Sequence, residues 1–211
     1  MNCQRRLINV LFLLFSSCIL TSTLCVAKES IKDGIQEYFY DTGELWAKKI
    51  YKNGKQNGVS KEFFKNGKIS KECNYIDGKK DGIYKMYYES GKLMEEWPFK
   101  MDRLDGEYKL YFESGKVKEI ANFKNGKPVG SYTTFYETGE ILQNGEYVKG
   151  KDLSHYKMYY KDGKLKEEGS LKEGLESGIK KKYDNEGKLI EWGVADDKKY
   201  NYLQLPDKDK K

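Results

Sequence analysis

Glycine returns every 24 residues along most of this chain. The first glycine series is Gly34, Gly58, Gly82, Gly106, Gly130 and Gly178, with Ser154 in the sixth place. A second series keeps the same spacing: Gly43, Gly67, Gly91, Gly115, Gly139, Gly163 and Gly187. Self-similarity at a fixed period of this length is the signature of a repeat architecture. The sequence therefore predicts seven units within residues 34–201.

Each unit is predicted to fold as a β-hairpin. In the third unit, the segments "IYKMYY" and "KLMEEWPF" have apolar and aromatic residues at the period of a strand rather than that of a helix. The connecting "ESG" ends in Gly91, and a three-residue hairpin loop needs a positive φ at its last residue, which glycine adopts readily. The predicted fold class is all-β: an elongated, twisted antiparallel meander of seven 24-residue β-hairpins in one sheet.

The loop length also predicts the strand register. If Tyr88 and Lys92 flank the loop, Tyr87 lies opposite Leu93. The same aromatic–aliphatic pair is predicted in the other units: Phe39 with Leu45, Phe63 with Ile69, Tyr111 with Val117, Phe135 with Ile141, Tyr159 with Leu165 and Tyr183 with Leu189. Such a pair contributes about 0.2 to 1 kcal/mol. Because single hairpins are then too weak, each must stack on the next.

The first 27 residues differ from the rest of the chain. Two arginines precede the apolar run "LINVLFLLFSSCIL", and small residues follow at Cys25 and Ala27. This pattern is typical of a secretory signal peptide cleaved after Ala27, and it predicts export to the periplasm, the cell surface or the medium. Two alternatives stay open: a lipid anchor at Cys18, and an uncleaved anchor over residues 7–27 that could just span a bilayer.

The rest of the chain is predicted to have three parts. Residues 28–33 are predicted to form a short linker, residues 34–201 the repeats, and residues 202–211 a flexible charged tail. Removal of the leader leaves Cys73 as the one remaining cysteine, so no disulfide can form within the mature chain. A single thiol in an exported protein indicates that Cys73 is buried and inert, with intermolecular pairing as the alternative.

An aromatic stripe is predicted on the face opposite the aromatic–aliphatic pairs. Its candidate binding residues are Tyr84, Tyr88, Tyr108, Phe112, Tyr132, Tyr136, Tyr156 and Tyr160. Equivalent residues of successive units are expected two strands, or about 10 Å, apart. The rings either pack on one another and on lysine stems, or they line a binding surface, since Tyr offers a large and rigid contact area. Both interpretations stay open.

Charge gives little indication of a nucleic-acid partner. Lys and Arg number 39 against 33 Asp and Glu, and loss of the two leader arginines lowers the formal net charge from +6 to +4. Acidic residues interleave with the lysines through most units, which is typical of a solvated surface rather than a basic stripe. Together with export, this pattern predicts no nucleic-acid binding.

The residues that enzymes need are mostly missing. His155 is the one histidine, so no histidine-based triad or multi-histidine metal site can form within the chain. Every "GK" lacks the following Ser or Thr of a phosphate-binding loop. Adjacent carboxylates such as Glu95 and Glu96 point to opposite faces of a strand. The sequence predicts no enzyme, no metal and no cofactor, with a cross-strand carboxylate pair of the glycosidase kind as the alternative.

The unit "GEYKLYFESGKVKEIANFKNGKPV" resembles the variant MORN repeat, whose bacterial members read much like "dG.w..yy.nGkl..e..y.nGkk". The resemblance covers nearly all of the chain after the leader. It implies a single elongated sheet of hairpins, and it implies association with membranes, phospholipids or protein scaffolds. Many bacterial members also carry an antitoxin label, from which the export signal departs. The resemblance implies no catalytic residues.

These features predict an exported, non-enzymatic interaction module. Its expected partner is a protein, bound through the aromatic stripe. The first alternative is a peripheral envelope protein whose lysines bind anionic phospholipid head groups. The second is an antitoxin-like neutraliser of a toxin. The sequence leaves the partner's identity and the oligomeric state open.

Overall fold

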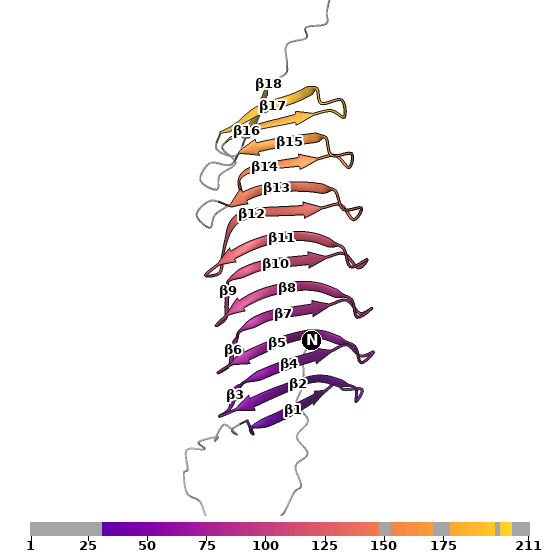
Figure 1. Cartoon of the computed structure of the whole chain (residues 1–211), viewed down its shortest axis with the longest axis vertical. Helices are drawn as coiled ribbons and strands as arrows, with labels where there is room; N and C mark the ends of the chain where they lie inside the picture. The colour runs from indigo at the N-terminus through magenta and orange to yellow at the C-terminus, as the bar shows by residue number, and fades with distance from the viewer. Residues whose placement is uncertain (1–30, 148–152, 171–177, 197–198, 204–211) are drawn as a thin grey trace, which may run out of the picture. The chain divides into compact units, whose positions relative to one another are not determined.

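The computed structural model describes residues 31–147, 153–170, 178–196 and 199–203 (Figure 1). The predicted signal peptide, the Cys18 lipidation site and residues 204–211 of the predicted tail lie outside these ranges. The described residues form 18 strands and contain no helix. Within the same ranges, no helix is long and apolar enough to cross a membrane.

Seven hairpins follow one another along the chain. Their strands are β1 (Gly34–Phe39) with β2 (Leu45–Lys52), β4 (Gly58–Phe63) with β5 (Ile69–Ile76), β7 (Gly82–Tyr87) with β8 (Leu93–Lys100), β10 (Gly106–Tyr111) with β11 (Val117–Lys124), β12 (Lys127–Phe135) with β13 (Ile141–Tyr147), β14 (Leu153–Tyr159) with β15 (Leu165–Ser170), and β16 (Ile179–Tyr183) with β17 (Leu189–Asp196). The two-residue strands β3 (Lys55–Gln56), β6 (Lys79–Lys80) and β9 (Arg103–Leu104) lead into the following hairpins, and β18 (Lys199–Leu203) follows the last.

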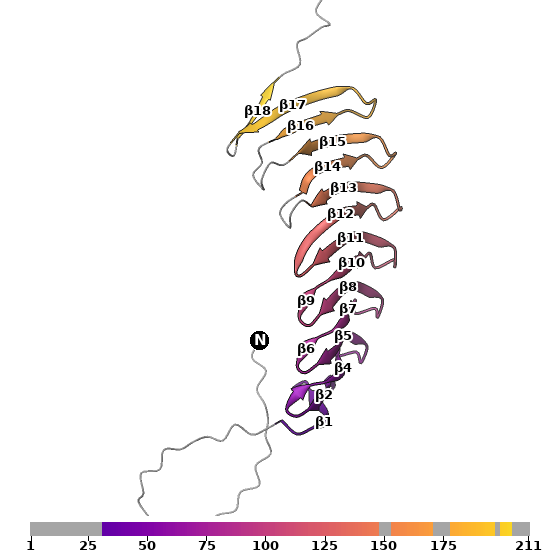
Figure 2. The same cartoon turned by 60° about the vertical axis from the view of Figure 1, so that its left-hand side comes forward.

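All these strands belong to one antiparallel sheet. Within each unit the two strands pair, and the second strand pairs with the first strand of the next unit, as β2 does with β4 and β5 with β7. Figure 1 shows the hairpins in chain order, and Figure 2 shows β18 beside β17, with which it pairs. The predicted all-β meander of hairpins is confirmed. β18 ends at Leu203, two residues inside the segment predicted as a tail.

The hairpin loops have the predicted length. In the third unit, the backbone N–H of Tyr88 donates to the carbonyl of Lys92 (2.9 Å), and that of Gly91 donates to the carbonyl of Tyr88 (2.8 Å). The same two bonds recur in all seven loops. The last loop residue is always a glycine, with φ between 80° and 112°. The predicted positive φ at this position is therefore confirmed.

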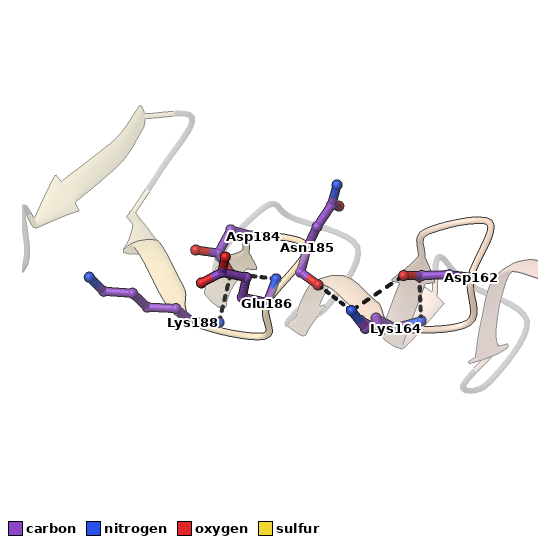
Figure 3. A network of polar contacts seen from close by, with 6 residues as sticks. All are labelled: Asp162, Lys164, Asp184, Asn185, Glu186 and Lys188. Atoms are coloured by element: carbon purple, nitrogen blue, oxygen red, sulfur yellow. Dashed lines mark hydrogen bonds and ion pairs between the residues drawn. The ribbon is translucent and has the colours of Figure 1, made fainter.

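Side-chain contacts also join neighbouring loops. Figure 3 shows Lys164, whose Nζ donates to the carbonyl of Asn185 in the next loop at 2.7 Å. In that last loop, Asp184 Oδ1 accepts from the backbone N–H groups of Glu186 and Lys188. Asp184 stands where the other units have an aromatic residue, and its carboxylate stabilises the loop instead.

The register pairs an aromatic residue with an aliphatic one beside every loop. Tyr87 lies opposite Leu93 in the third unit. The corresponding pairs are Phe39–Leu45, Phe63–Ile69, Tyr111–Val117, Phe135–Ile141, Tyr159–Leu165 and Tyr183–Leu189. Directly after each pair the register shifts by one residue, so that Met94 is an extra residue in β8. This bulge was not predicted from the sequence.

The two faces of the sheet differ in burial. Side chains alternate between faces along a strand. We call the side that carries Tyr87 and Leu93 the pair face, and the opposite side, which carries Tyr84 and Tyr108, the Tyr face. Most buried residues of the described sheet lie on the Tyr face: Ala47, Tyr51, Ser60, Cys73, Tyr108, Ala121 and Gly193. On the pair face Pro98, which lies opposite Ile83, is buried. The core of the described sheet therefore lies mainly on its Tyr face.

Cys73 belongs to this core. It is a free cysteine with 2% of its surface exposed, as the prediction of a buried thiol requires. Burial raises the pKa of its thiol to about 11. Because the thiolate is the reactive form, this shift keeps Cys73 unreactive near neutral pH.

Candidate functional site

The central row of the aromatic stripe is packed into the Tyr face. The ring of Tyr108 lies 4.2 Å from that of Trp97, centroid to centroid, and only 7% of Tyr108 is exposed. Tyr84 meets Phe99 edge to face at 6.1 Å, and Tyr132 meets Tyr147 in the same manner at 5.9 Å. These aromatic contacts stabilise the sheet, and the described residues form no second layer over it.

Tyr156 shows how closely this row is packed. A Cβ atom on Gly169 would lie 2.5 Å from the Cε1 atom of the Tyr156 ring, so only glycine leaves room for the ring there. The Tyr156 hydroxyl donates to Glu167 Oε1 at 2.9 Å. The ring and the hydroxyl of Tyr156 therefore both have partners within the sheet.

The outer row of the stripe links consecutive hairpins. The hydroxyls of Tyr88, Tyr136 and Tyr160 each donate to a backbone carbonyl of the next unit, at 2.7, 2.9 and 2.8 Å. Phe112 occupies the same position without a hydroxyl, and Lys118 Nζ lies 5.6 Å from its ring. All eight predicted stripe residues thus contact other residues of the same sheet.

Burial also affects the chemistry of these tyrosines. It raises the pKa of Tyr84 to about 12 and that of Tyr108 further. The hydroxyls consequently stay protonated over the physiological pH range and act as hydrogen-bond donors. This arrangement suits structural contacts and gives no sign of a catalytic tyrosine.

The pair face of the first three units carries a row of charges, which we call the pair-face charge row. Lys48 Nζ lies 2.7 Å from Glu37, Lys61 Nζ lies 3.1 Å from Glu72, and Lys85 Nζ lies 4.0 Å from Glu96. Each pair joins adjacent strands, and most of these side chains are partly exposed. Each of these lysines is therefore paired with a carboxylate of the neighbouring strand.

Another position of the pair face lies two residues before Glu37 in the first unit and is held by Ile35. Its equivalents in later units are apolar in some units and polar in others. Ile35, Val59 and Ile83 hold this position in the first three units and are exposed. Glu107, Ser131 and His155 hold it in the fourth, fifth and sixth units, and the exposed Ile179 holds it in the seventh. The pair face is therefore polar at this position in the middle of the sheet and apolar toward both ends.

A groove of about 610 Å³ lies over this polar part of the pair face, across β12 to β16. Its lining is Ser131, Tyr132, Thr133, Asn144, Gly145, Glu146, His155, Tyr156, Lys157, Tyr159, Glu168, Gly169, Ser170, Ile179 and Lys181, which includes two predicted stripe residues, Tyr132 and Tyr156. The hydroxyl and amide groups can both donate and accept hydrogen bonds. Sequence reasoning missed this groove, although the loss of the apolar residue at Ser131 and His155 was a visible signal.

The charges that line the groove cancel. Two lysines and two glutamates contribute. Lys157 lies opposite Glu168 in the register, and Lys181 Nζ lies 3.5 Å from the same carboxylate, which also accepts from the Tyr183 hydroxyl. A groove with balanced charge and many neutral hydrogen-bonding groups is suited to a polar, uncharged ligand segment.

The groove offers no metal centre among the described residues. Glu146 lies opposite both Ser131 and His155 in the register. Within the described ranges, no group of three or more His, Cys, Asp and Glu side chains is placed to hold a metal ion. What the arrangement can do is hold a ligand by hydrogen bonds.

Comparison with known proteins identifies the repeat. The family model of the MORN repeat variant matches residues 32–53, 56–77, 80–101, 104–125, 128–149 and 155–173, more than half of the chain. No curated protein matches the chain. MORN repeats form a non-catalytic family and are generally protein- or membrane-interaction repeats. The six matched repeats, together with the stacked hairpins, establish that the chain belongs to the MORN repeat variant family.

Proposed function

We propose that this chain is an exported, non-enzymatic repeat protein that binds a protein partner on its sheet. The family's general role in protein or membrane interaction supports binding as the activity. The leader pattern of residues 1–27 supports export. The absence of catalytic residues from the sequence pattern supports a role without chemistry.

The polar groove on the pair face is the single observation that favours a particular contact surface. It lies where Ser131 and His155 replace the apolar residue found in four other units, as Glu107 does in the fourth unit, and departures from a local rule concentrate at functional sites. The aromatic side chains of the Tyr face instead pack on one another, as Tyr108 does on Trp97, or donate a hydroxyl hydrogen bond to the next unit, as Tyr88 does. In this proposal the Tyr face shapes the sheet and the groove contacts the partner.

Partner capture from envelope fractions tests the proposal. The purified protein serves as bait beside a Ser131→Ile/His155→Ile variant, which restores at both positions the residue found in the first and third units. Because exposed isoleucine is already accommodated at this position, the variant should fold. We expect the wild type to retain a partner that the variant loses. Equal retention by both proteins would remove the groove from the proposal.

Two further variants complete this experiment. Ile83→Ser replaces an apolar residue by a polar one at the equivalent position of the third unit. Because Ile83 does not line the groove, this variant should capture the partner as the wild type does. Tyr108→Ser/Tyr132→Ser tests the alternative in which the aromatic stripe binds the partner. We expect this double variant to lose stability because it empties the Tyr-face packing. A folded double variant that fails to capture the partner would instead assign binding to the stripe.

A second candidate function is binding to an anionic membrane surface. It is favoured by the exposed Ile35, Val59 and Ile83, which lie beside the lysines of the pair-face charge row. The protein would then sediment with phosphatidylglycerol vesicles at low salt, and added salt would release it. No sedimentation at low ionic strength would remove this candidate.

A further inference from the structure

The outer edge of β1 is the one first-strand edge without a neighbouring hairpin among the described residues. In the internal units, β4, β7 and β10 pair along this edge with β2, β5 and β8. β1 pairs with β2 alone (Figure 1). At the other end of the sheet, the outer edge of β17 is covered by β18. The two ends therefore differ: β1 presents the edge through which every other hairpin joins its neighbour, whereas the other end of the described sheet is the outer edge of β18.

The hydrogen-bonding groups on this edge can be assigned. Tyr40 N–H donates to the Glu44 carbonyl inside the hairpin, so alternation turns the backbone groups of Ile35, Glu37 and Phe39 outward. The internal equivalent of Phe39 supports this assignment, because the Phe63 carbonyl faces the preceding unit and accepts from the Tyr40 hydroxyl at 2.7 Å. An unpaired row of this kind is a template for another strand.

The side chains along the same edge are apolar and uncovered. Ile35 is 65% exposed and Phe39 is 54% exposed, whereas Phe63, which a preceding unit covers, is only partly exposed. The strand "GIQEYF" contains no Lys or Pro, the residues that commonly protect an edge from further pairing. Its exposed surface is therefore suited to pairing.

We propose that β1 pairs antiparallel with β1 of a second copy of this chain, about a two-fold axis at Glu37. This register sets Ile35 opposite Phe39 of the second copy, and the reverse, so two apolar cross-strand pairs form. It also uses the outward backbone groups of Ile35, Glu37 and Phe39 on both copies. The two Glu37 carboxylates meet near the axis, where Lys48, at 2.7 Å from its own Glu37, offsets their repulsion.

A second copy fits this edge better than continued head-to-tail growth. Head-to-tail stacking onto β17 is blocked because β18 occupies its outer edge, so the next copy would have to pair with β18, a strand outside the seven hairpins. The two-fold arrangement uses the same edge on both copies and therefore closes after two. The inference thus predicts a dimer and no filament.

Sedimentation velocity over a concentration series tests the dimer, with Glu37→Pro as the blocking variant. The Glu37 N–H faces outward, so proline there removes no hydrogen bond within the hairpin but removes one from the dimer. We expect the wild type to dimerise and Glu37→Pro to dissociate at least tenfold more readily, with similar thermal midpoints at concentrations where both proteins are monomeric. Glu37→Gln is the matched control: it keeps the N–H, removes the like charges, and should dimerise at least as tightly as the wild type.

Proline at the equivalent internal position checks the geometry. Lys61 is the equivalent of Glu37 in the second unit, and its backbone N–H faces β2, with which it pairs. Lys61→Pro should therefore remove a hydrogen bond of the folded protein and lower its thermal midpoint. A wild-type protein that stays monomeric at all concentrations would overturn the inference. A dimer that Glu37→Pro leaves intact would equally overturn it, because the copies would then meet elsewhere.

Discussion

At the scale of single residues, the outer-row tyrosines are the most instructive side chains. The repeat places Tyr at this position in four units and Phe in two, so the chain contains its own comparison. Where Tyr40, Tyr88, Tyr136 and Tyr160 stand, a hydroxyl bonds the next hairpin; where Phe64 and Phe112 stand, that hydroxyl is missing. The outer row therefore contributes unequally to the cohesion of successive units.

Exchanging these residues measures that contribution. Tyr136→Phe removes a hydrogen bond to the Tyr159 carbonyl and should lower the free energy of unfolding by about 1 kcal/mol. Phe112→Tyr supplies a hydroxyl at the equivalent position, facing the carbonyl of Phe135, and should raise the free energy of unfolding. Urea denaturation followed by circular dichroism gives both values. Unchanged midpoints in both variants would show that the hydroxyls do not hold the units together.

The buried tyrosines also predict how stability depends on pH. The pKa values of Tyr75, Tyr84 and Tyr111 are raised from 10 to about 12, chiefly by burial. The folded state therefore holds these protons more tightly than the unfolded state does. Their stabilisation is complete below pH 10 and is lost as the pH rises through about 12.

Urea midpoints at a series of alkaline pH values test this dependence. We expect the midpoint to fall between pH 10 and 12, and Tyr84→Phe should make the fall shallower because one raised pKa is gone. If Tyr84→Phe follows the wild-type curve, Tyr84 is not buried in the folded state as described.

At the scale of the hairpin, much of the structure follows from the sequence. Glycine spacing and strand periodicity predict the loops, because a three-residue loop needs a positive φ at a fixed place and alternation sets the faces. The bulge at Met94 could not be predicted from the loop, because one extra residue there leaves the pair of Tyr87 and Leu93 unchanged. The groove could not be predicted for a different reason. A repeat is recognised by what its units share, whereas Ser131 and His155 matter because they differ.

The connections between hairpins supply a prediction at this scale. Asn53 and Gly54 both have positive φ, as suits a two-residue turn, and Asp-Gly and Asn-Gly recur in two later units. The third unit uses Met101 and Asp102 instead, with φ of 49° and 66°. Met101 is exposed, and neither its size nor its shape favours this conformation.

Met101→Asn should therefore raise the free energy of unfolding by about 1 kcal/mol, since Asn tolerates the left-handed region better than Met. Asp102 is kept, because its carboxylate accepts from the Lys80 backbone N–H at 2.7 Å. Chemical denaturation compares the two proteins. A variant no more stable than the wild type would mean that the turn carries no strain.

At the scale of the whole described sheet, hairpins pair only with their neighbours. Stability should therefore be close to a sum of unit and junction contributions, as in other repeat proteins. The seventh hairpin illustrates the strength of the register. It lies beyond the residues that the family model matches, yet Tyr183 still pairs with Leu189 as in the other six units. The same regularity makes the polar groove of β12 to β16 stand out.

The affinity of the captured partner for the two groove proteins tests the central claim most directly. Isothermal titration calorimetry compares the wild type with Ser131→Ile/His155→Ile, after circular dichroism has shown that both have the same fold. Binding through the groove predicts at least a tenfold weaker affinity for the variant, and little effect of salt on the wild type because the lining charges cancel. An unchanged affinity in the variant would contradict the claim that the pair-face groove holds the partner.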